Sequence, residues 1–542
     1  MKFAKDAFTV GVMTMLSRIL GFVRDMLFAA VLGTGPIAGA FIVAFRIPNL
    51  FRRIFAEGAF NAAFVPLYNK KIERDGEAAA TKFASEAMSG LVLILLILTA
   101  LFEIFMPTFL GGIAWGFRAD ADKYDLAVEL ARIMFPYLMF LSIMALIAGI
   151  LNSFQKFAIA ALVPVLLNVV VVSAIIILVL LNVIEQELVA RYLSYAVTFA
   201  GFVQVAAIWY YCKKQGHLPH FMRPTFNKDI KELVNLGVPG MIAGGITQIN
   251  IVIGTGIATS YTGAVGYLYY ADRLYQLPLG VVGVAVGVVL LPSLSRAFAA
   301  HDKTEANDLQ NRALEFSMML TVPAMVAFLF IAEVVVSVLF ERGRFNAPAT
   351  VETAIVLRAF AVGLPAFVAI KVFSPGFFAN QDTKTPMYYG IATIIANTVM
   401  ALIFAQYWQH VGIAIATSIA AWMNCLLLAG TLYWRGHFKL DVKCIKTLPM
   451  IVIASLLMGA CVYYSAVYLS PWLSADNNDI LRGGLMSLLV IEGAVTYGLF
   501  LHYTGALTFS EMKGFVKRKN KNSKPLEKAK NSSDNSSTDK KS

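Results

Sequence analysis

Charged residues and cysteines are both scarce in this chain of 542 residues. Only 14% of its residues are charged and 58% are hydrophobic, whereas a soluble globular protein is about a quarter charged and about half apolar. The four cysteines are scattered and form no CxxC pair, so they support neither a disulfide framework nor a zinc site. The sequence also has no P-loop and no HExxH motif. We therefore expect a protein that is not an enzyme and has no cofactor.

Long apolar blocks, separated by short polar breaks, make up most of the chain. The block at 158–181 is long enough to cross about 30 Å of hydrocarbon as a helix. Similar blocks recur throughout and predict an all-α, polytopic membrane protein with about fourteen transmembrane helices. Their approximate ranges are 7–33, 38–69, 83–110, 125–151, 158–182, 189–212, 230–259, 263–296, 310–340, 350–378, 386–407, 411–434, 446–469 and 481–504.

Lysine and arginine gather in alternate loops, such as 70–82, 213–228 and 435–446, while the opposite loop 470–479 has none. By the positive-inside rule this pattern predicts a multi-pass protein of the bacterial cytoplasmic (inner) membrane with both termini in the cytoplasm. The formal charge of +12 comes largely from the tail at 509–542. Its mixture of lysine, serine and asparagine is typical of a disordered cytoplasmic tail, and we expect no nucleic-acid partner.

A weak internal repeat divides the chain. Matching residues recur at an offset of about 226 to 229 positions, and they indicate a parallel duplication with some six helices in each half. We predict two pseudo-symmetric six-helix lobes, 1–225 and 226–440, that face each other across a cavity, and two extra helices in 441–508. A purely structural duplication is the alternative. The matching pairs are Arg46 and Arg273, Pro66 and Pro292, Pro136 and Pro365, Asn152 and Asn380, Gln155 and Gln381, and Asn168 and Asn397.

Ionisable residues lie inside several predicted spans. Each buried cation costs roughly 2.5–3.5 kcal/mol even on the lenient insertion scale, so these side chains must line water or be paired. Cations outnumber carboxylates, which predicts a positively charged cavity that receives an anion. The residues are Arg18, Arg24, Asp25, Arg46, Arg52, Arg53, Glu57, Asp272, Arg273 and Lys371.

Roles within this set differ. Arg46 and Lys371 could snorkel to the membrane surface or form ion pairs. Arg53 and Glu57 are four residues apart and are predicted to form a structural pair. At Pro48 two interpretations stay open: the helix restarts there and cradles phosphate with free N–H groups, or the proline only kinks it. The predicted substrate-binding residues are Arg18, Arg24, Arg52 and Arg273.

Four long segments resemble the MurJ (MviN) family of lipid II flippases, in the multidrug/oligosaccharidyl-lipid/polysaccharide exporter superfamily. They are SRILGFVRD, RIPNLFRRIFAEGAFNAAFVP, YYADRLYQLPLGVVGVAVGVVLLPSLS and PGFFANQDTKTP. The resemblance implies fourteen helices in two lobes, with the last two helices forming a groove for a polyprenyl tail. It also implies that undecaprenyl-pyrophosphoryl disaccharide-pentapeptide moves from the cytoplasmic to the periplasmic leaflet by alternating access, for peptidoglycan biosynthesis.

The resemblance also assigns functional arginines to Arg18, Arg24, Arg52 and Arg273. Many relatives carry an acidic residue where Gly39 stands, so a gating contact there is missing or replaced. A sodium site of some members would fall near Asp382 and Thr398. We expect a monomer whose partners are lipid II, the membrane and cell-wall synthesis proteins, and which depends on the membrane potential or on a monovalent cation.

Three other functions remain as alternatives. The chain could export another polyprenyl-linked polysaccharide or drugs within the same superfamily, although a cationic-drug exporter should present carboxylates in its cavity. A membrane-embedded enzyme acting on polyprenyl phosphates would need convergent acids or histidines, with or without Mg²⁺. A non-transporting scaffold gives no reason to keep arginines at membrane depth.

Overall fold

The computed structural model describes residues 2–55, 59–300 and 302–504, and this part of the chain contains helices and no strands, which confirms the predicted all-α class. The helices are α1 (Lys2–Leu32), α2 (Pro36–Phe55), α3 (Ala59–Ile113), the 3₁₀ helix η1 (Trp115–Ala119), α4 (Ala121–Met134), α5 (Tyr137–Ser153), α6 (Phe157–Leu180), α7 (Gln186–Lys214), α8 (Lys228–Thr259), α9 (Ala264–Ala299), α10 (Lys303–Phe340), α11 (Ala347–Ala379), α12 (Lys384–Trp434), α13 (Val442–Leu473) and α14 (Asp479–Tyr503).

Most predicted spans correspond to one helix, and the exceptions have local causes. α3 contains a break at Gly76, where φ is 84°, and holds the end of the predicted span 38–69 before the span 83–110. α12 contains a break at Gln409, where φ is 48°, and holds the two predicted spans 386–407 and 411–434. The predicted span 125–151 is divided into α4 and α5 at Pro136. Within the described residues, nine helices are long and apolar enough to cross a membrane by length and composition.

Pro48 does not start a new helix. α2 runs without interruption from Pro36 to Phe55 with Pro48 inside it, so the predicted restart with a cradle of free N–H groups is wrong. Membrane helices tolerate proline because nearby polar groups satisfy the backbone. Here the side-chain amide of Asn49 donates to the carbonyl of Phe45 at 3.0 Å.

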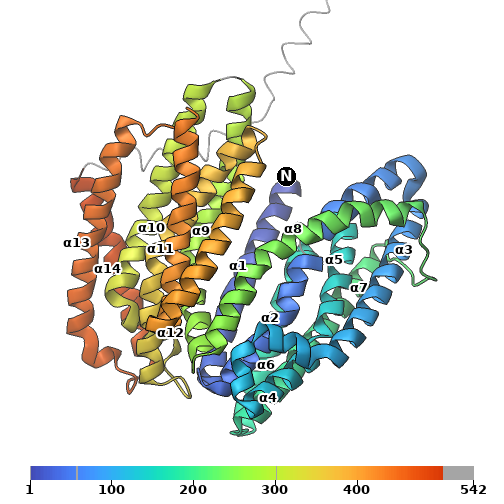
Figure 1. The fold of residues 1–542 in the computed structure, drawn as a ribbon, viewed down its shortest axis with the longest axis horizontal. Helices are drawn as coiled ribbons and strands as arrows, with labels where there is room; N and C mark the ends of the chain where they lie inside the picture. The colour runs from blue at the N-terminus through green and yellow to red at the C-terminus, as the bar shows by residue number, and fades with distance from the viewer. Residues whose placement is uncertain (1, 56–58, 301, 505–542) are drawn as a thin grey trace, which may run out of the picture.

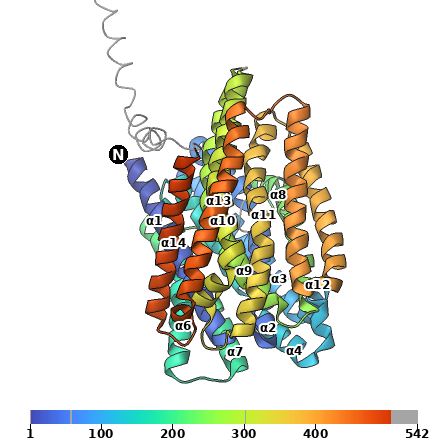
Figure 2. The ribbon, with the colours of Figure 1, turned by 90° about the vertical axis from the view of Figure 1, so that its left-hand side faces the viewer.

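The helices form two groups with α1 between them (Figure 1). α2 to α7 make up one group and α9 to α14 the other. α8 crosses from the first group to the second and packs against both α3 and α12, so the predicted lobe boundary at 225/226 precedes a helix that belongs to neither side alone. α13 packs on α10, and α14 packs on α13 at the outside of the second group (Figure 2).

Backbone conformations support the internal repeat. In the described residues, four positions other than glycine have positive φ: Gln155 (57°), Gln381 (59°), Asn182 (51°) and Gln409 (48°). They form two pairs separated by the same interval as the sequence repeat. Such conformations are unfavourable for residues with a side chain, so their recurrence at equivalent turns indicates duplicated structure. The first turn of each half is also marked, by Gly33 and Gly263 with φ of 68° and 74°.

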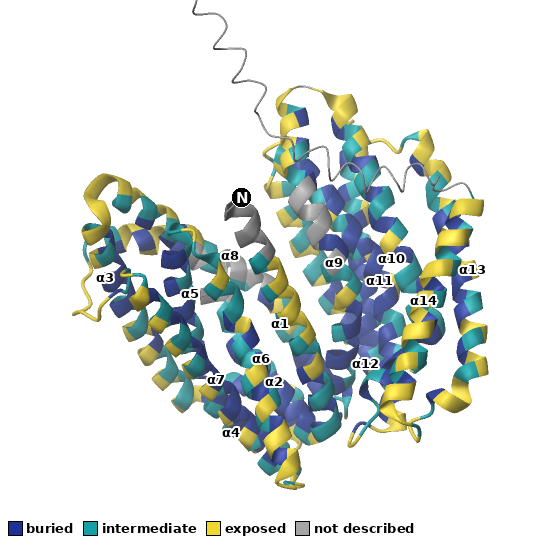
Figure 3. Cartoon of the chain, turned by 180° about the vertical axis from the view of Figure 1, so that it is seen from behind, coloured by how far each residue is buried: buried dark blue, intermediate teal, exposed yellow. Residues whose placement is uncertain are grey.

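At the end of the molecule near the α1–α2 turn, two glycines make reciprocal contacts between the groups. Gly116 of η1 lies against the backbone of Thr259 and Ser260, and its N–H donates to the Thr259 hydroxyl at 3.1 Å. Gly343 lies against the carbonyl of Ala30, which accepts from the Arg344 N–H at 2.8 Å. We call Gly116 and Gly343, with these contacts, the glycine clasp. Toward the opposite end the two groups diverge (Figure 3).

We predict that Gly116→Ala loosens the clasp. A Cβ at this position would overlap backbone atoms of Thr259 and Ser260, which no side-chain rotation can relieve, and overpacking of this kind costs about 1–3 kcal/mol. The melting temperature of the detergent-purified protein should fall measurably. Gly112→Ala is the matched control because a Cβ there meets nothing within 4 Å. Equal melting temperatures for both variants would contradict a tight contact at Gly116.

Candidate functional site

Asp25, two turns before the C-terminal end of α1, joins the two groups of helices. It is 2% exposed. The guanidinium of Arg24 donates to its Oδ1 from Nη2 at 2.8 Å and from Nε at 3.2 Å. From α9, the Tyr269 hydroxyl donates to the same oxygen at 2.9 Å, and Nε of Arg273 lies 3.3 Å from Oδ2. One buried carboxylate thus holds two guanidinium groups and a tyrosine.

Helix geometry explains how these side chains meet. Arg24 and Asp25 are adjacent, so they point about 100° apart around α1, and the Nη1 of Arg24 reaches Asn168 of α6 at 3.0 Å while Asp25 faces α9. Tyr269 and Arg273 are one turn apart on α9. The Arg273 guanidinium therefore lies over the Tyr269 ring, 4.7 Å from its centroid, and cation–π attraction adds to the ion pair.

Two further cations face open space beside α9. Arg18 is exposed, although it lies inside the first membrane helix, and its Nη1 is close to Gly280. Lys371 of α11 is also exposed, and its ammonium lies against Gly283, one turn further along α9. The absence of side chains at these glycines leaves room for both cations. Among the described residues, Arg18 and Lys371 have no carboxylate within ion-pair distance.

Arg46, Arg52 and Asp272 complete the described set. Arg46 donates from Nη1 to the Thr255 hydroxyl of α8 at 2.9 Å and lies 5.8 Å from the Tyr269 ring centroid. Arg52 donates from Nε to Oδ1 of Asn49 at 3.4 Å. Asp272 accepts a hydrogen bond from Gln276. The Arg53 side chain and Glu57 lie outside the described residues, so their predicted pairing stays a prediction.

The charge balance of these described side chains is strongly positive. Six cations stand against two carboxylates, and Asp25 is shared between two of the cations. A surplus of this size at membrane depth is tolerable only where water or a mobile anion reaches it. The arrangement therefore suits an anionic ligand and offers no paired acid and base. The six cations are Arg18, Arg24, Arg46, Arg52, Arg273 and Lys371, and the carboxylates are Asp25 and Asp272.

Gly39 is buried on α2. A Cβ added there would make ordinary contacts, 3.6 Å from the Phe117 ring and 3.8 Å from Cε of Lys123. The Lys123 ammonium instead lies over the Phe117 ring, 3.9 Å from its centroid. A cation–π contact between η1 and α4 therefore lies beside Gly39.

Asp382 and Thr398 cannot share a sodium ion. Asp382 accepts from Arg435 at 2.6 Å and from the N–H and hydroxyl of Thr385 at 2.9 and 2.6 Å, and these hydrogen bonds hold the pKa of its carboxyl well below the usual range. Thr398 lies thirteen residues beyond Thr385 on the same helix, about 20 Å away at 1.5 Å per residue. The joint site predicted from sequence is wrong for this reason.

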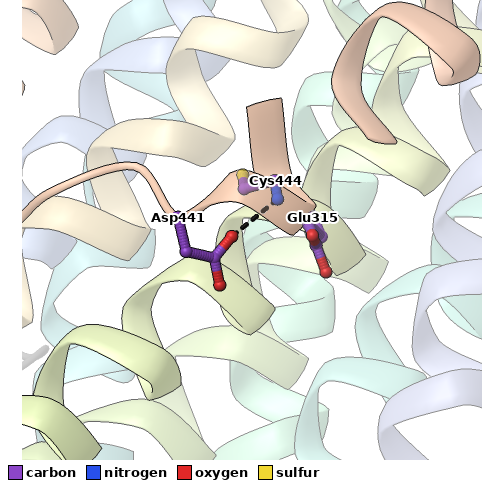
Figure 4. Close-up of side chains that lie close together, drawn as sticks. All are labelled: Glu315, Asp441 and Cys444. Atoms are coloured by element: carbon purple, nitrogen blue, oxygen red, sulfur yellow. Dashed lines mark hydrogen bonds between the residues drawn. The ribbon is translucent and has the colours of Figure 1, made fainter. Parts of the chain in front are cut away.

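Glu315, Asp441 and Cys444 form the cluster that most resembles a metal site among the described residues (Figure 4). However, the guanidinium of Arg312 already bonds both carboxylates. Asp441 also caps α13, because its Oδ1 accepts from the Cys444 N–H at 2.6 Å. The cluster is therefore explained as a junction between α10 and α13, with its charges satisfied by an arginine.

Arg482 is a buried residue whose role the sequence did not reveal. It is 1% exposed and donates to Ser337 Oγ and to the carbonyls of Ser337, Leu473 and Glu341, at 2.8–3.3 Å. These bonds anchor the α13–α14 hairpin to the end of α10. No local pattern in the sequence shows that this side chain turns inward.

Comparisons with known proteins show what the whole chain is similar to. The family model described as lipid II flippase MurJ matches residues 28–477. The chain is 42% identical to a probable lipid II flippase MurJ of Rhizobium tropici over 520 residues, which cover 96% of this chain and 97% of that protein. It is similar to a solved lipid II flippase MurJ in an inward closed conformation, with a TM-score of 0.75, 26% identity and coverage of 91% and 98%. It also has the fold of an inward-facing multidrug resistance MATE family transporter of the MOP superfamily, with a TM-score of 0.64, 16% identity and coverage of 79% and 97%.

We predict that Asp25→Asn destabilises the protein strongly. The substitution leaves Arg24 and Arg273 without their shared carboxylate, and breaking a buried ion pair costs about 3–5 kcal/mol. Thermal unfolding in detergent measures the effect. The control is Asp229→Asn, because Asp229 pairs with Lys71 at 2.9 Å while 39% exposed, and such pairs contribute about 0–1 kcal/mol. Similar losses for the two variants would contradict a central role for Asp25.

Proposed function

The chain belongs to the lipid II flippase MurJ family, and we propose that it carries lipid II, undecaprenyl-pyrophosphoryl disaccharide-pentapeptide, from the cytoplasmic to the periplasmic leaflet for peptidoglycan biosynthesis. The observation that carries this proposal is the surplus of cations around α1 and α9. A diphosphate is the most highly charged part of such a substrate, and guanidinium groups bind its oxygens in bidentate fashion.

The accessible cations are the ones that meet the diphosphate. Arg18 and Lys371 are exposed and Arg273 is 35% exposed, so each can exchange water for phosphate oxygens. Arg24 is 8% exposed and bonded to Asp25 and Asn168. We assign Arg24 to positioning Asp25, and hence Arg273, and we add Lys371 to the residues that bind the diphosphate.

Transport proceeds by alternating access. The glycine clasp holds the two groups of helices together at one end, and they diverge at the end that carries the N-terminus (Figure 3). With both termini in the cytoplasm, as the loop charges indicate, the divergent end faces the cytoplasm. The headgroup enters there while the lipid tail stays in the bilayer or along α13 and α14. Opening of the clasp then exposes the headgroup to the periplasm.

Charge movement supplies a driving force for this cycle. An inside-negative potential favours outward movement of an anion by about 2.3 kcal/mol per charge at 100 mV. We propose that transport depends on this potential, or on a monovalent cation that resets the empty protein. The reaction makes and breaks no covalent bond, so it needs no cofactor and no catalytic residue. The protein works as a monomer in the inner membrane and receives lipid II from the cell-wall synthesis machinery.

Export of a cationic drug is the rival that the charges disfavour most. Such a ligand would be repelled by the like charges of Arg18, Arg273 and Lys371. The Asp25 carboxylate is already shared between two arginines and cannot offset this repulsion. Export of a different polyprenyl-linked polysaccharide uses the same cations, and only the transported headgroup distinguishes it.

We predict that Arg18→Ala and Arg273→Ala each abolish growth of a strain depleted of its own flippase. Each substitution removes a cation that the diphosphate contacts, while membrane levels of the protein, measured by immunoblot, stay normal. Arg191→Ala is the matched control, because Arg191 bonds Glu129 at 2.9 Å on α7, away from α9. Wild-type growth of both test variants would contradict the assignment.

Purified protein in proteoliposomes should expose fluorescent lipid II on the far leaflet faster than empty liposomes do. An imposed inside-negative potential should increase the outward rate, since the headgroup is an anion. Access of a membrane-impermeant quencher measures the exposure. Movement of a polyprenyl-linked polysaccharide in place of lipid II would favour the rival exporter.

A further inference from the structure

A second cavity lies inside the group α2–α7, apart from the space beside α9. It is lined by residues of α1, α2, α5, α6 and α7 and has a volume of about 390 Å³, which is room for roughly a dozen water molecules. Pockets of this size with a few placed polar groups are typical of small-molecule sites. We call it the lobe pocket. The diphosphate chemistry described above makes no use of it.

The floor of the lobe pocket is polar and deeply buried. Arg24, Tyr137, Asn168 and Gln204 line it and are all less than 9% exposed. Arg24 donates to Asn168 at 3.0 Å, Tyr137 donates to Gln204 at 3.1 Å, and Gln204 donates to the Val163 carbonyl at 2.7 Å. This network fixes one cation and two side-chain amides at one end of the cavity.

The walls and the rim differ from the floor. The walls are small or aliphatic, and Ala148 lies near the end of α5 while Ala160 lies near the start of α6. The rim includes half-buried Asn49 and Arg52. A ligand entering from the rim would therefore pass a cation and an apolar stretch before its leading group meets Arg24.

This shape selects a terminal anion. A diphosphate that carries a lipid on one side and sugars on the other has no free end that could reach a closed floor. The carboxylate at the end of a peptide is a terminal anion, and small peptide side chains suit alanine-lined walls. Because the floor is built from amide and hydroxyl groups around one guanidinium, it can bind both a carboxylate and the preceding peptide bond.

We propose that the lobe pocket binds the free carboxylate end of the peptide carried by the substrate, with its last side chains against the alanine-lined walls. This inference rests on the proposed function and adds a second point of recognition to it. Arg24 then belongs both to the Asp25 cluster and to the pocket floor. Peptide binding on one side of α1 is thereby linked to the diphosphate site on the other.

The test compares three fluorescent substrates in proteoliposomes: lipid II with a free peptide carboxylate, the same lipid with a C-terminal carboxamide, and the same lipid shortened by two residues. We expect the first to move roughly tenfold faster than the other two at limiting concentration. The carboxamide lacks the charge for a charge-assisted hydrogen bond, and the shortened peptide holds its carboxylate too far from the floor to form one. Equal rates for all three overturn this proposal and leave the proposed function intact. No movement of any of them contradicts the proposed function itself.

Variants that fill the pocket provide the second arm. Ala148→Phe and Ala160→Phe place a ring in the pocket from two different helices, so one variant can be used if the other does not fold. In both variants we expect the three substrates to move at similar rates. Ala206→Phe is the matched control, because Ala206 is exposed on α7 and should keep the tenfold preference. Filled variants that also keep the preference overturn the proposal.

A soluble acetylated dipeptide with a free carboxylate should compete with the substrate, and decanoate should not. Equal competition by decanoate would assign the pocket to lipid carboxylates and overturn the assignment to a peptide.

Discussion

The constraint that governs this protein is the cost of holding guanidinium groups at membrane depth. Hydrocarbon offers no hydrogen bonds and little screening, so a charge there must find a carboxylate, a dipole, water or an anionic ligand. Asp25 meets part of this need by accepting from Arg24 and Tyr269 while it faces Arg273. One carboxylate cannot neutralise two cations. The shared carboxylate explains why α1 and α9 meet at this point, and the remaining positive charge explains why the neighbouring space has to admit an anion.

The internal duplication does not make the two halves equivalent. Asn168 on α6 accepts from Arg24 on α1. At the corresponding positions of the second half, Asn397 on α12 donates to Asn250 on α8 at 2.7 Å. The helix contact is the same and the charge is lost, because an amide stands where the first half has an arginine. Anion recognition is thus concentrated on the first half, on the α9 face turned toward it and on Lys371 of α11 beside that face.

Much of the fold follows from the sequence because membrane helices are specified by long, local composition, and each apolar block carries its own evidence. The repeat was also predictable, since turn residues such as Gln155 and Gln381 recur at a fixed interval and adopt the same positive φ. The charged residues were identifiable for a related reason: an arginine inside an apolar block stands out.

Partners across helices were not predictable, because they depend on packing between segments far apart in the chain. Nothing near Asp25 indicates that Arg273 and Tyr269 will reach it, and nothing near Arg482 indicates that it bonds the end of α10. The lobe pocket, formed by five helices, left no local trace at all. The error at Asp382 and Thr398 arose in the same way, because Asp382 lies in the turn before α12 while Thr398 lies well along that helix.

The glycine clasp has a mechanical consequence. Its two contacts are related by the duplication, and each presses backbone on backbone, so neither can stretch by turning a side chain. A rocking motion about the axis that relates the halves would part both contacts in the same instant. The closed end therefore opens only when both contacts break together. Packed interfaces of this kind switch between discrete conformations, and intermediate conformations are little populated.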